Sequence, residues 1–395
     1  MKKLILLFPF VLFANNLLND LKQKELFFDK QKSIENSKEL FKSWINPINL
    51  TYSYSKDNSL GDIKTTTKTF SISVNQPIFK SGAIYYSIKY ANDSKEFNLL
   101  NIELQKRELI KKALDLAFDY KINSLNKEII LLNIENAKID VKKKKEAFLK
   151  GIEDSTFLNN AILNLNNLKL NLEELKVNLN NLKYSFNNIS NLQIDKVKLP
   201  EFKLISKEEF INSNIDYILQ KKLKKVKKDL HKMQIGNQLL SVNLQASLNW
   251  QNIDYSKTTP NLQNRNIDFY KIGFSVVLPI SFNALNKIEQ TKLDYLKSTI
   301  LLEDKKVTLA NEYKSILSQI KLINRKIAIY KQNIKIYNDL ISSTKDSIIV
   351  GNATKLDLIL LQNSQKTNEL NIKILKLQKE KLLLNLYYKL LSYQL

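Results

Sequence analysis

The sequence lacks cysteine and contains very little glycine, proline, histidine or arginine. With no cysteine in 395 residues, disulfides and thiolate metal sites are excluded. Six glycines are too few for an all-β or α/β domain with many tight turns. The only histidine, His231, lies in a lysine-rich segment, and no catalytic triad, metal-ligand cluster or glycine-rich phosphate loop is present. The sequence therefore predicts no enzyme, no catalytic residues, no cofactor and no metal site.

The charge is strongly basic, but almost all of it is lysine. The formal net charge is +23, and arginine occurs only at Arg107, Arg265 and Arg325. Base readout and bidentate phosphate binding favour arginine, whereas here lysine is dispersed through every predicted helix. Nucleic acid is therefore not an expected partner.

The N-terminus has the pattern of a secretory signal peptide. Lys2 and Lys3 precede an apolar run from Leu4 to Phe13, and Ala14 supplies the small residue before a cleavage site. We expect residues 1–14 to be a signal peptide and the mature chain to be exported. No later stretch has the roughly 18 consecutive apolar residues of a membrane-spanning helix.

Four short segments alternate apolar and polar residues. In the first, Leu50, Tyr52 and Tyr54 share one face and Thr51 and Ser53 the other. The predicted strands are 47–56, 68–77, 241–250 and 269–279. At about 9–11 residues, each is long enough to cross a bilayer as a tilted strand. Four strands cannot close a barrel, and an open sheet edge in lipid leaves backbone amides unpaired. The chain therefore either associates with copies of itself or is not a membrane protein.

The chain reads as an internal duplication. The segment Ser73–Phe79 (SVNQPIF) is repeated as Ser275–Ser281 (SVVLPIS), and Gly151 is repeated as Gly351. The first repeat, 15–195, is predicted to contain a helix, two strands, a long helix at 83–150 and a helix at 152–189. The second repeat, 196–395, is predicted to contain, besides its two strands, helices at 206–240, 283–350 and 352–391. A helix-poor stretch near Pro200 connects them.

The long helices carry coiled-coil patterns. Apolar residues from Tyr313 to Ile348 alternate spacings of three and four, and a second such series runs from Leu158 to Ile189. At 1.5 Å per residue each long helix spans about 100 Å, far more than a globular helix. Apolar residues off these seams lie on a second flank, as expected if the helices form a wall: Leu163, Leu170, Ile329 and Ile336.

Glycine and proline mark the ends of these elements. Gly151 and Gly351 each end a long helix and are predicted to form hairpin tips through left-handed C-caps. Pro77 and Pro279 are expected where a strand stops pairing and a helix is about to begin, with Gly82 in the same transition.

Aromatic residues cluster around the predicted strands. They would form the interfacial girdle of a barrel, the alternative being ordinary packing in a soluble sheet. These residues are Trp44, Tyr52, Tyr54, Trp250, Phe269 and Tyr270.

Four motifs recur in a fixed order along the two repeats. These are Asn46–Leu50 entering a strand, Gln76–Gly82 leaving one, Leu278–Ile280, and Gly351–Ile359 (GNATKLDLI) at the second hairpin tip. In their order and double occurrence they resemble the TolC-like outer-membrane efflux protein family, and Gly351–Ile359 is similar to the helix turn at that family's periplasmic tip. The resemblance covers essentially the whole mature chain.

The resemblance implies a mixed, mainly α fold. Long antiparallel coiled-coil hairpins would form an α-barrel in the periplasm, and four transmembrane strands per chain would contribute to a twelve-stranded barrel shared by a homotrimer in the outer membrane of a Gram-negative bacterium. It also implies lipid contact, a periplasmic adaptor and an inner-membrane transporter of the RND or ABC type, in efflux or type I secretion. The cargo, whether drugs, metal ions or polypeptides, is not readable from the sequence.

The resemblance also places a gate near the second hairpin tip. Asp357 matches the position of an acidic ring that narrows the tunnel entrance, although an Asp near a helix start is also favoured by the helix dipole. The chain departs from the family pattern at Leu360, where a second Asp is usual, at Phe157, the corresponding position in the first hairpin, and at Ala353, where a basic residue is usual. Leu360 and Phe157 could form an apolar constriction, with acidic charge from Glu153 and Asp154.

The sequence also allows an alternative, a soluble periplasmic protein. A periplasmic coiled-coil adaptor or scaffold with a small β-domain would have the same helices, but it would bury the apolar faces of its strands. The two readings differ in whether those faces contact lipid.

Overall fold

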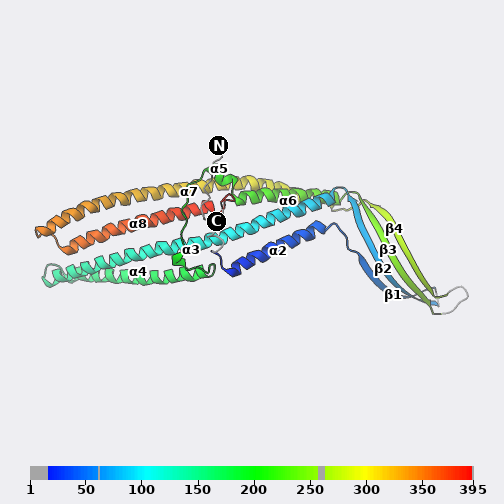
Figure 1. Cartoon of the computed structure of the whole chain (residues 1–395), viewed down its shortest axis with the longest axis horizontal. Coiled ribbons are helices and arrows are strands. Elements are labelled where there is room, and N and C mark those ends of the chain that lie inside the picture. Colours follow the sequence, from blue (N-terminus) through cyan, green and yellow to red (C-terminus); the bar gives the residue numbers. More distant parts are fainter. Residues whose placement is uncertain (1–16, 61–62, 257–262, 394–395) are drawn as a thin grey trace. The chain divides into compact units, whose positions relative to one another are not determined.

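The structure is a computed structural model that describes residues 17–60, 63–256 and 263–393 (Figure 1). The expected signal peptide, 1–14, lies outside these residues. Helices dominate, and one antiparallel sheet has the strand order β1-β2-β3-β4. The helices are α2 (Asp20–Lys42), α3 (Ala83–Leu149), α4 (Ser155–Asn187), α5 (Lys207–Asn212), α6 (Ile215–Asn237), α7 (Ala284–Ile349) and α8 (Lys355–Tyr387). The strands are β1 (Asn49–Leu60), β2 (Ile63–Lys80), β3 (Ser241–Tyr255) and β4 (Arg265–Val277). None of the helices within the described ranges is long and apolar enough to cross a membrane.

The two long helices match their predicted bounds to within a residue. The helix predicted at 206–240 is instead broken between α5 and α6. The break lets the backbone pair with the C-terminal segment: the Ile215 amide donates to the Lys389 carbonyl at 2.7 Å, and the Leu391 amide to the Ser213 carbonyl at 3.0 Å. Asn214 at this point is fully buried, and its side chain accepts a hydrogen bond from the Asp216 amide. Sequence periodicity continues through the break and gives no sign of it.

The strands are longer than predicted. The predicted strands leave residues 57–67 and 251–268 outside the sheet, but the strand ladders continue through most of both segments. Their polar residues pair in register, for example Lys56 with Thr66 and Asp254 with Thr66. Hydrophobic alternation finds only the part of a strand that has an apolar face, so polar strand ends escape it.

Pro77 does not end its strand. β2 runs on to Lys80, with a bulge in its pairing with β3 between Pro77 and Phe79. The pairing of β2 with β1 begins only at Ser73, so this end of β2 is paired on one side alone and a residue without an N–H is tolerated there. The turn into α3 needs the positive φ of Gly82, +83°. Pro279 does lie between β4 and α7, as expected.

The chain divides into two compact units. Among the described residues, the sheet unit comprises Asp29–Asn101 and Leu219–Lys305, and the helical unit comprises 17–28, Ile102–Ile218 and 306–393. In the helical unit the helices are neighbours in the order α4, α3, α8, α7, as Figure 1 shows. A cation–π contact joins α4 to α3, an ion pair joins α3 to α8, and a side-chain hydrogen bond joins α8 to α7. Its core gathers large side chains from several helices: Phe118, Phe186, Phe210, Leu309 and Leu384.

Candidate functional site

Both hairpin tips are built on the same glycine-dependent turn. Gly151 has φ +68° and Gly351 φ +80°. After α3, the Ile152 amide donates to the Ala147 carbonyl at 2.9 Å; after α7, the Asn352 amide donates to the Ser347 carbonyl at 2.8 Å. In both turns the amide donates to the carbonyl five positions earlier, which is the hydrogen bond of a Schellman cap. This cap needs a positive φ at the position that glycine occupies. Each glycine therefore lies in the turn that joins a long helix to the next helix.

Two acidic residues near the tips begin the returning helices. Asp154 is the N-cap of α4 and accepts a hydrogen bond from the Thr156 amide at 2.7 Å. Hydrogen bonding to Thr156, first to its side chain and then to its amide, lowers the pKa of Asp154. Asp357 forms a capping box at the start of α8: it accepts from the Thr354 amide at 2.9 Å, while the Thr354 hydroxyl oxygen accepts from the Asp357 amide. Both residues thus stabilise helix starts, whatever else they do.

An ion pair at Asp357 joins the two hairpins. The Lys143 ammonium of α3 donates to the Asp357 carboxylate of α8, and both side chains are a little over one third exposed. The Lys143 bond first, and then those from Thr354, hold the pKa of Asp357 well below its usual range. Asp357 is therefore ionised at neutral pH, and much of its negative charge is compensated within the same chain.

The other gate candidates lie on the first hairpin and on α8. Glu153 accepts from the Lys144 ammonium at 2.7 Å, and this bond raises the pKa of Lys144. The same ammonium lies 5.3 Å from the centre of the Phe157 ring, which is half exposed. Leu360 is half-buried one turn into α8. Phe157 thus remains accessible beside the ion-paired Lys144, and Leu360 remains partly accessible on α8.

Sequence reasoning missed the polar contacts that connect α3 to α8. Asn136, which interrupts an apolar seam, accepts from the Asn363 amide at 2.8 Å, and Asn363 also donates to Glu135 at 3.1 Å. Lys381, which interrupts the seam of the last helix, donates to Asp119 at 2.6 Å. The available signal was one polar interruption in the apolar seam of each helix, but only the fold shows which residue of the other helix each one contacts.

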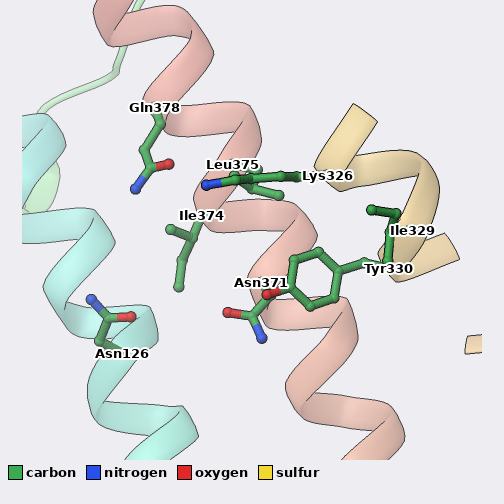
Figure 2. Close-up of a pocket in the computed structure, with 8 residues that line it drawn as sticks. All are labelled: Asn126, Lys326, Ile329, Tyr330, Asn371, Ile374, Leu375 and Gln378. Atoms are coloured by element: carbon green, nitrogen blue, oxygen red, sulfur yellow. The ribbon is translucent and has the colours of Figure 1, made fainter. Parts of the chain in front are cut away.

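A hollow of about 450 Å³ lies where α7, α8 and α3 meet (Figure 2). Its lining combines three amide side chains, Asn126, Asn371 and Gln378, with Lys326, Tyr330 and the aliphatic Ile329, Ile374 and Leu375. Lys326 and Ile329 remain exposed. The hollow is a polar recess in the helical layer, and no acidic group lines it.

The sheet has one apolar and one polar face. Tyr52 pairs with Phe70, and Phe70 with Trp250, all on one face; the Phe70 and Trp250 ring centres lie 5.5 Å apart. Residues directly opposite one another in antiparallel strands share a face. Tyr54 and Tyr270 belong to the same apolar face by their alternation with these residues. Most of this face is exposed in the single chain.

Two aromatic residues do not fit the predicted girdle. Phe269 pairs with Asn249 and so lies on the polar face, because its neighbour Tyr270 takes the apolar one. Trp44 lies in the turn after α2, before β1 begins, where its carbonyl accepts from the Gln76 side chain at 3.2 Å. Trp250 lies inside β3 rather than at its boundary. The apolar face can therefore supply Tyr52, Tyr54, Trp250 and Tyr270 to an interface, but not Phe269.

Comparisons with known proteins agree with this arrangement. Residues 234–389 match the family model of the outer membrane efflux protein. The outer membrane protein VceC of Vibrio cholerae has a similar structure, with a TM-score of 0.73 at 12% identity over 94% of each chain. The Campylobacter jejuni CmeC outer membrane channel is similar at a TM-score of 0.75 and 16% identity, over 95% of this chain and 84% of that one. The Neisseria gonorrhoeae MtrE outer membrane channel, solved in an open state, has a TM-score of 0.66 at 13% identity, over 95% and 86%.

No curated protein matches the chain in sequence. The family model and the shared fold of these channels nevertheless agree with the resemblance carried by the sequence motifs. The matched family is one of outer membrane efflux proteins and not of enzymes. Residues 234–389 thus match the outer membrane efflux protein family, and the chain as a whole has the fold of these outer membrane channels.

Proposed function

We propose that three copies of this chain form one passive exit duct. The observation that carries the proposal is an open four-stranded sheet whose apolar face is exposed. Within the described residues, the outer edges of β1 and β4 have no strand partner. Unpaired strand edges are not tolerated in lipid, whereas three sheets joined edge to edge close a twelve-stranded barrel. Its apolar face would then contact lipid, and its polar face would line a water-filled lumen.

The helical unit supports the same assembly. Its outermost helices, α4 and α7, each carry an exposed apolar stripe with a spacing of seven residues. The stripe on α4 is Leu163, Leu170, Val177 and Tyr184, and that on α7 is Leu322, Ile329 and Ile336. A seven-residue repeat is the pattern of a coiled-coil seam. In the proposed trimer, α4 of each copy packs against α7 of the next, which closes the ring of helices.

The hairpin tips form the periplasmic entrance in this proposal. Asp357 would lie at its narrowest part, with Leu360 and Phe157 as apolar neighbours and Glu153 and Asp154 on the first hairpin. Because Lys143 compensates Asp357 within the chain, the pair's main role would be to hold the α3–α4 hairpin against the α7–α8 hairpin. Three such pairs would keep the entrance narrow until a partner separates the hairpins.

The partners complete the proposed duct. A periplasmic adaptor and an inner-membrane transporter of the RND or ABC type would deliver the cargo and supply the energy, in efflux or type I secretion. Drugs, metal ions and secreted polypeptides remain the candidate cargo classes.

The first experiment is extraction of the mature protein from cell envelopes, with and without detergent, followed by mass determination of the purified particle. The proposal expects a particle of three chains that needs detergent. A monomer or dimer that stays in solution without detergent would overturn it, because the apolar sheet face would then need a different cover.

A further inference from the structure

We propose that Lys271 forms a cationic ring in the lumen of the barrel and that this ring favours the passage of anions over cations. The inference rests on the proposed trimer, in which each copy contributes one lysine. It concerns the sheet rather than the hairpin tips, and it assigns a selectivity element that the entrance residues do not provide.

The pairing register places Lys271 in a row of small polar residues. Lys271 lies opposite Ser247, Ser247 opposite Ser73, and Ser73 opposite Asn49. This row crosses the whole four-stranded sheet and contains a single charged residue. Repeated in three copies, it becomes a circle of three ammonium groups among nine neutral side chains.

The neighbours of Lys271 along β4 decide which side it faces. Tyr270 and Ile272 are 75% and 70% exposed and belong to the apolar face. Alternation along a strand therefore directs Lys271 to the opposite, polar face. In a membrane barrel the polar face is the lumen, because a charged side chain at mid-membrane depth on the lipid side costs about 2–4 kcal/mol.

Charges on the polar face are mostly basic. Lys80 pairs with Ser241 at the helix-facing end of the sheet, and Arg265 and Asp57 lie near the loop end. By alternation, the other two strand carboxylates, Asp254 and Asp268, belong to the apolar face. Among the described strand residues, no acidic group on the polar face lies between Asp57 and the helix-facing end. No carboxylate on that face therefore lies beside Lys271 in the middle of the sheet.

The local packing keeps the ammonium uncompensated. The Lys271 nitrogen lies 5.3 Å from the centre of the Phe269 ring on the same face. A ring attracts a cation without cancelling its charge, unlike a carboxylate. On the other side along the strand is Gly273, beside which an added Cβ would meet no atom within 4 Å, so the side chain has room to reach into the lumen.

The first test measures ion selectivity in planar bilayers. Reversal potentials in a KCl gradient give the ratio of chloride to potassium permeability for the wild type and for Lys271→Gln. Near 0.1 M salt, where the Debye length is about 10 Å, we expect the substitution to lower this ratio roughly threefold. At 1 M salt the Debye length falls to about 3 Å and the difference should shrink.

The matched control is Lys56→Gln. Lys56 lies on the apolar side of β1, where its ammonium is 5.8 Å from the Tyr54 ring centre. The control removes the same charge from the same sheet and should leave the ratio unchanged. An unchanged ratio in Lys271→Gln, or an equal change in both variants, would overturn the proposal.

The second test uses the absence of native cysteine. Lys271→Cys and Tyr270→Cys are placed one at a time and exposed to a water-soluble, membrane-impermeant thiol reagent in reconstituted trimers. We expect Lys271→Cys to react and Tyr270→Cys to be protected by lipid. Reaction at Tyr270→Cys alone would overturn the lumen assignment of Lys271. Equal reaction at both would instead overturn the membrane barrel, so failure of the ring and failure of the duct are distinguishable.

Discussion

The ion pair between Lys143 and Asp357 gives the sharpest prediction about the entrance. Replacing Lys143 by Met removes the ammonium but leaves the capping box of Asp357 and Thr354 in place. We therefore expect α8 to keep its stability while the contact between the two hairpins weakens. Asp357→Asn, by contrast, should weaken both the contact and the helix start.

The strength of this ion pair follows from the exposure of its two side chains to solvent. The side chains of Lys143 and Asp357 are 37% and 38% exposed, so solvent screens the pair and each copy contributes about 0.5 kcal/mol. Three copies acting together in a trimer would stabilise the closed entrance by about 1.5 kcal/mol, which is roughly a tenfold change in the ratio of closed to open channels.

Single-channel recording in planar bilayers measures this directly. Lys143→Met should be open about ten times more often than the wild type, and the double variant with Asp357→Asn should add little. Lys142→Met, which removes an exposed charge one residue away, serves as the control. If Lys143→Met opens no more often than this control, the pair does not hold the entrance closed.

The lowered pKa of Asp357 fixes how closure of the entrance depends on pH. The pKa of Asp357 is lowered in the folded protein from its ordinary 3.8. A lowered carboxyl pKa means that its stabilisation is fully present above about 3.8 and is lost as the pH falls further, toward the folded-state pKa. Closure by this pair should therefore be constant between neutral pH and pH about 5, and a change of open probability in that range would point to another group.

Three further predictions concern the stability and assembly of the chain. Arg107 is buried and donates to the Leu390 and Tyr393 carbonyls at 2.7 and 2.9 Å, so Arg107→Met should destabilise the helical unit by about 3 kcal/mol. Its thermal unfolding midpoint should fall below that of the control Arg325→Met, which replaces an exposed arginine. Ile329→Glu should shift the purified particle from trimer to monomer, whereas Ile329→Leu should not. Gly351→Ala should cost about 1–2 kcal/mol through its positive φ alone, because nothing lies within 4 Å of the added Cβ; an unchanged midpoint would refute this.

Much of the fold is readable from local pattern. Alternation located all four strands, coiled-coil spacing indicated long packed helices, and Gly151 and Gly351 marked the ends of the two longest. These features follow from short-range rules, namely side-chain period and the conformational freedom of glycine. The same rules missed the polar strand ends and the break at Asn214, where pairing with a distant segment replaces hydrophobic pattern.

Only part of the candidate site could be predicted from the sequence. The sequence located Asp357 at the tip, but its partner Lys143 is 214 positions away and lies among several other lysines. Which lysine meets the carboxylate depends on the rotation and packing of α3 against α8. Likewise, the aromatic set around the strands looked uniform until the register placed Phe269 on the polar face.

The sequence by itself determined the elements, their order and the two-faced character of the sheet, because each depends on residues a few positions apart. The tertiary structure decided which charges meet, which row Lys271 occupies and which helix faces remain uncovered. Those outcomes depend on contacts between distant segments, where one residue of register or one turn of helix rotation changes the partner.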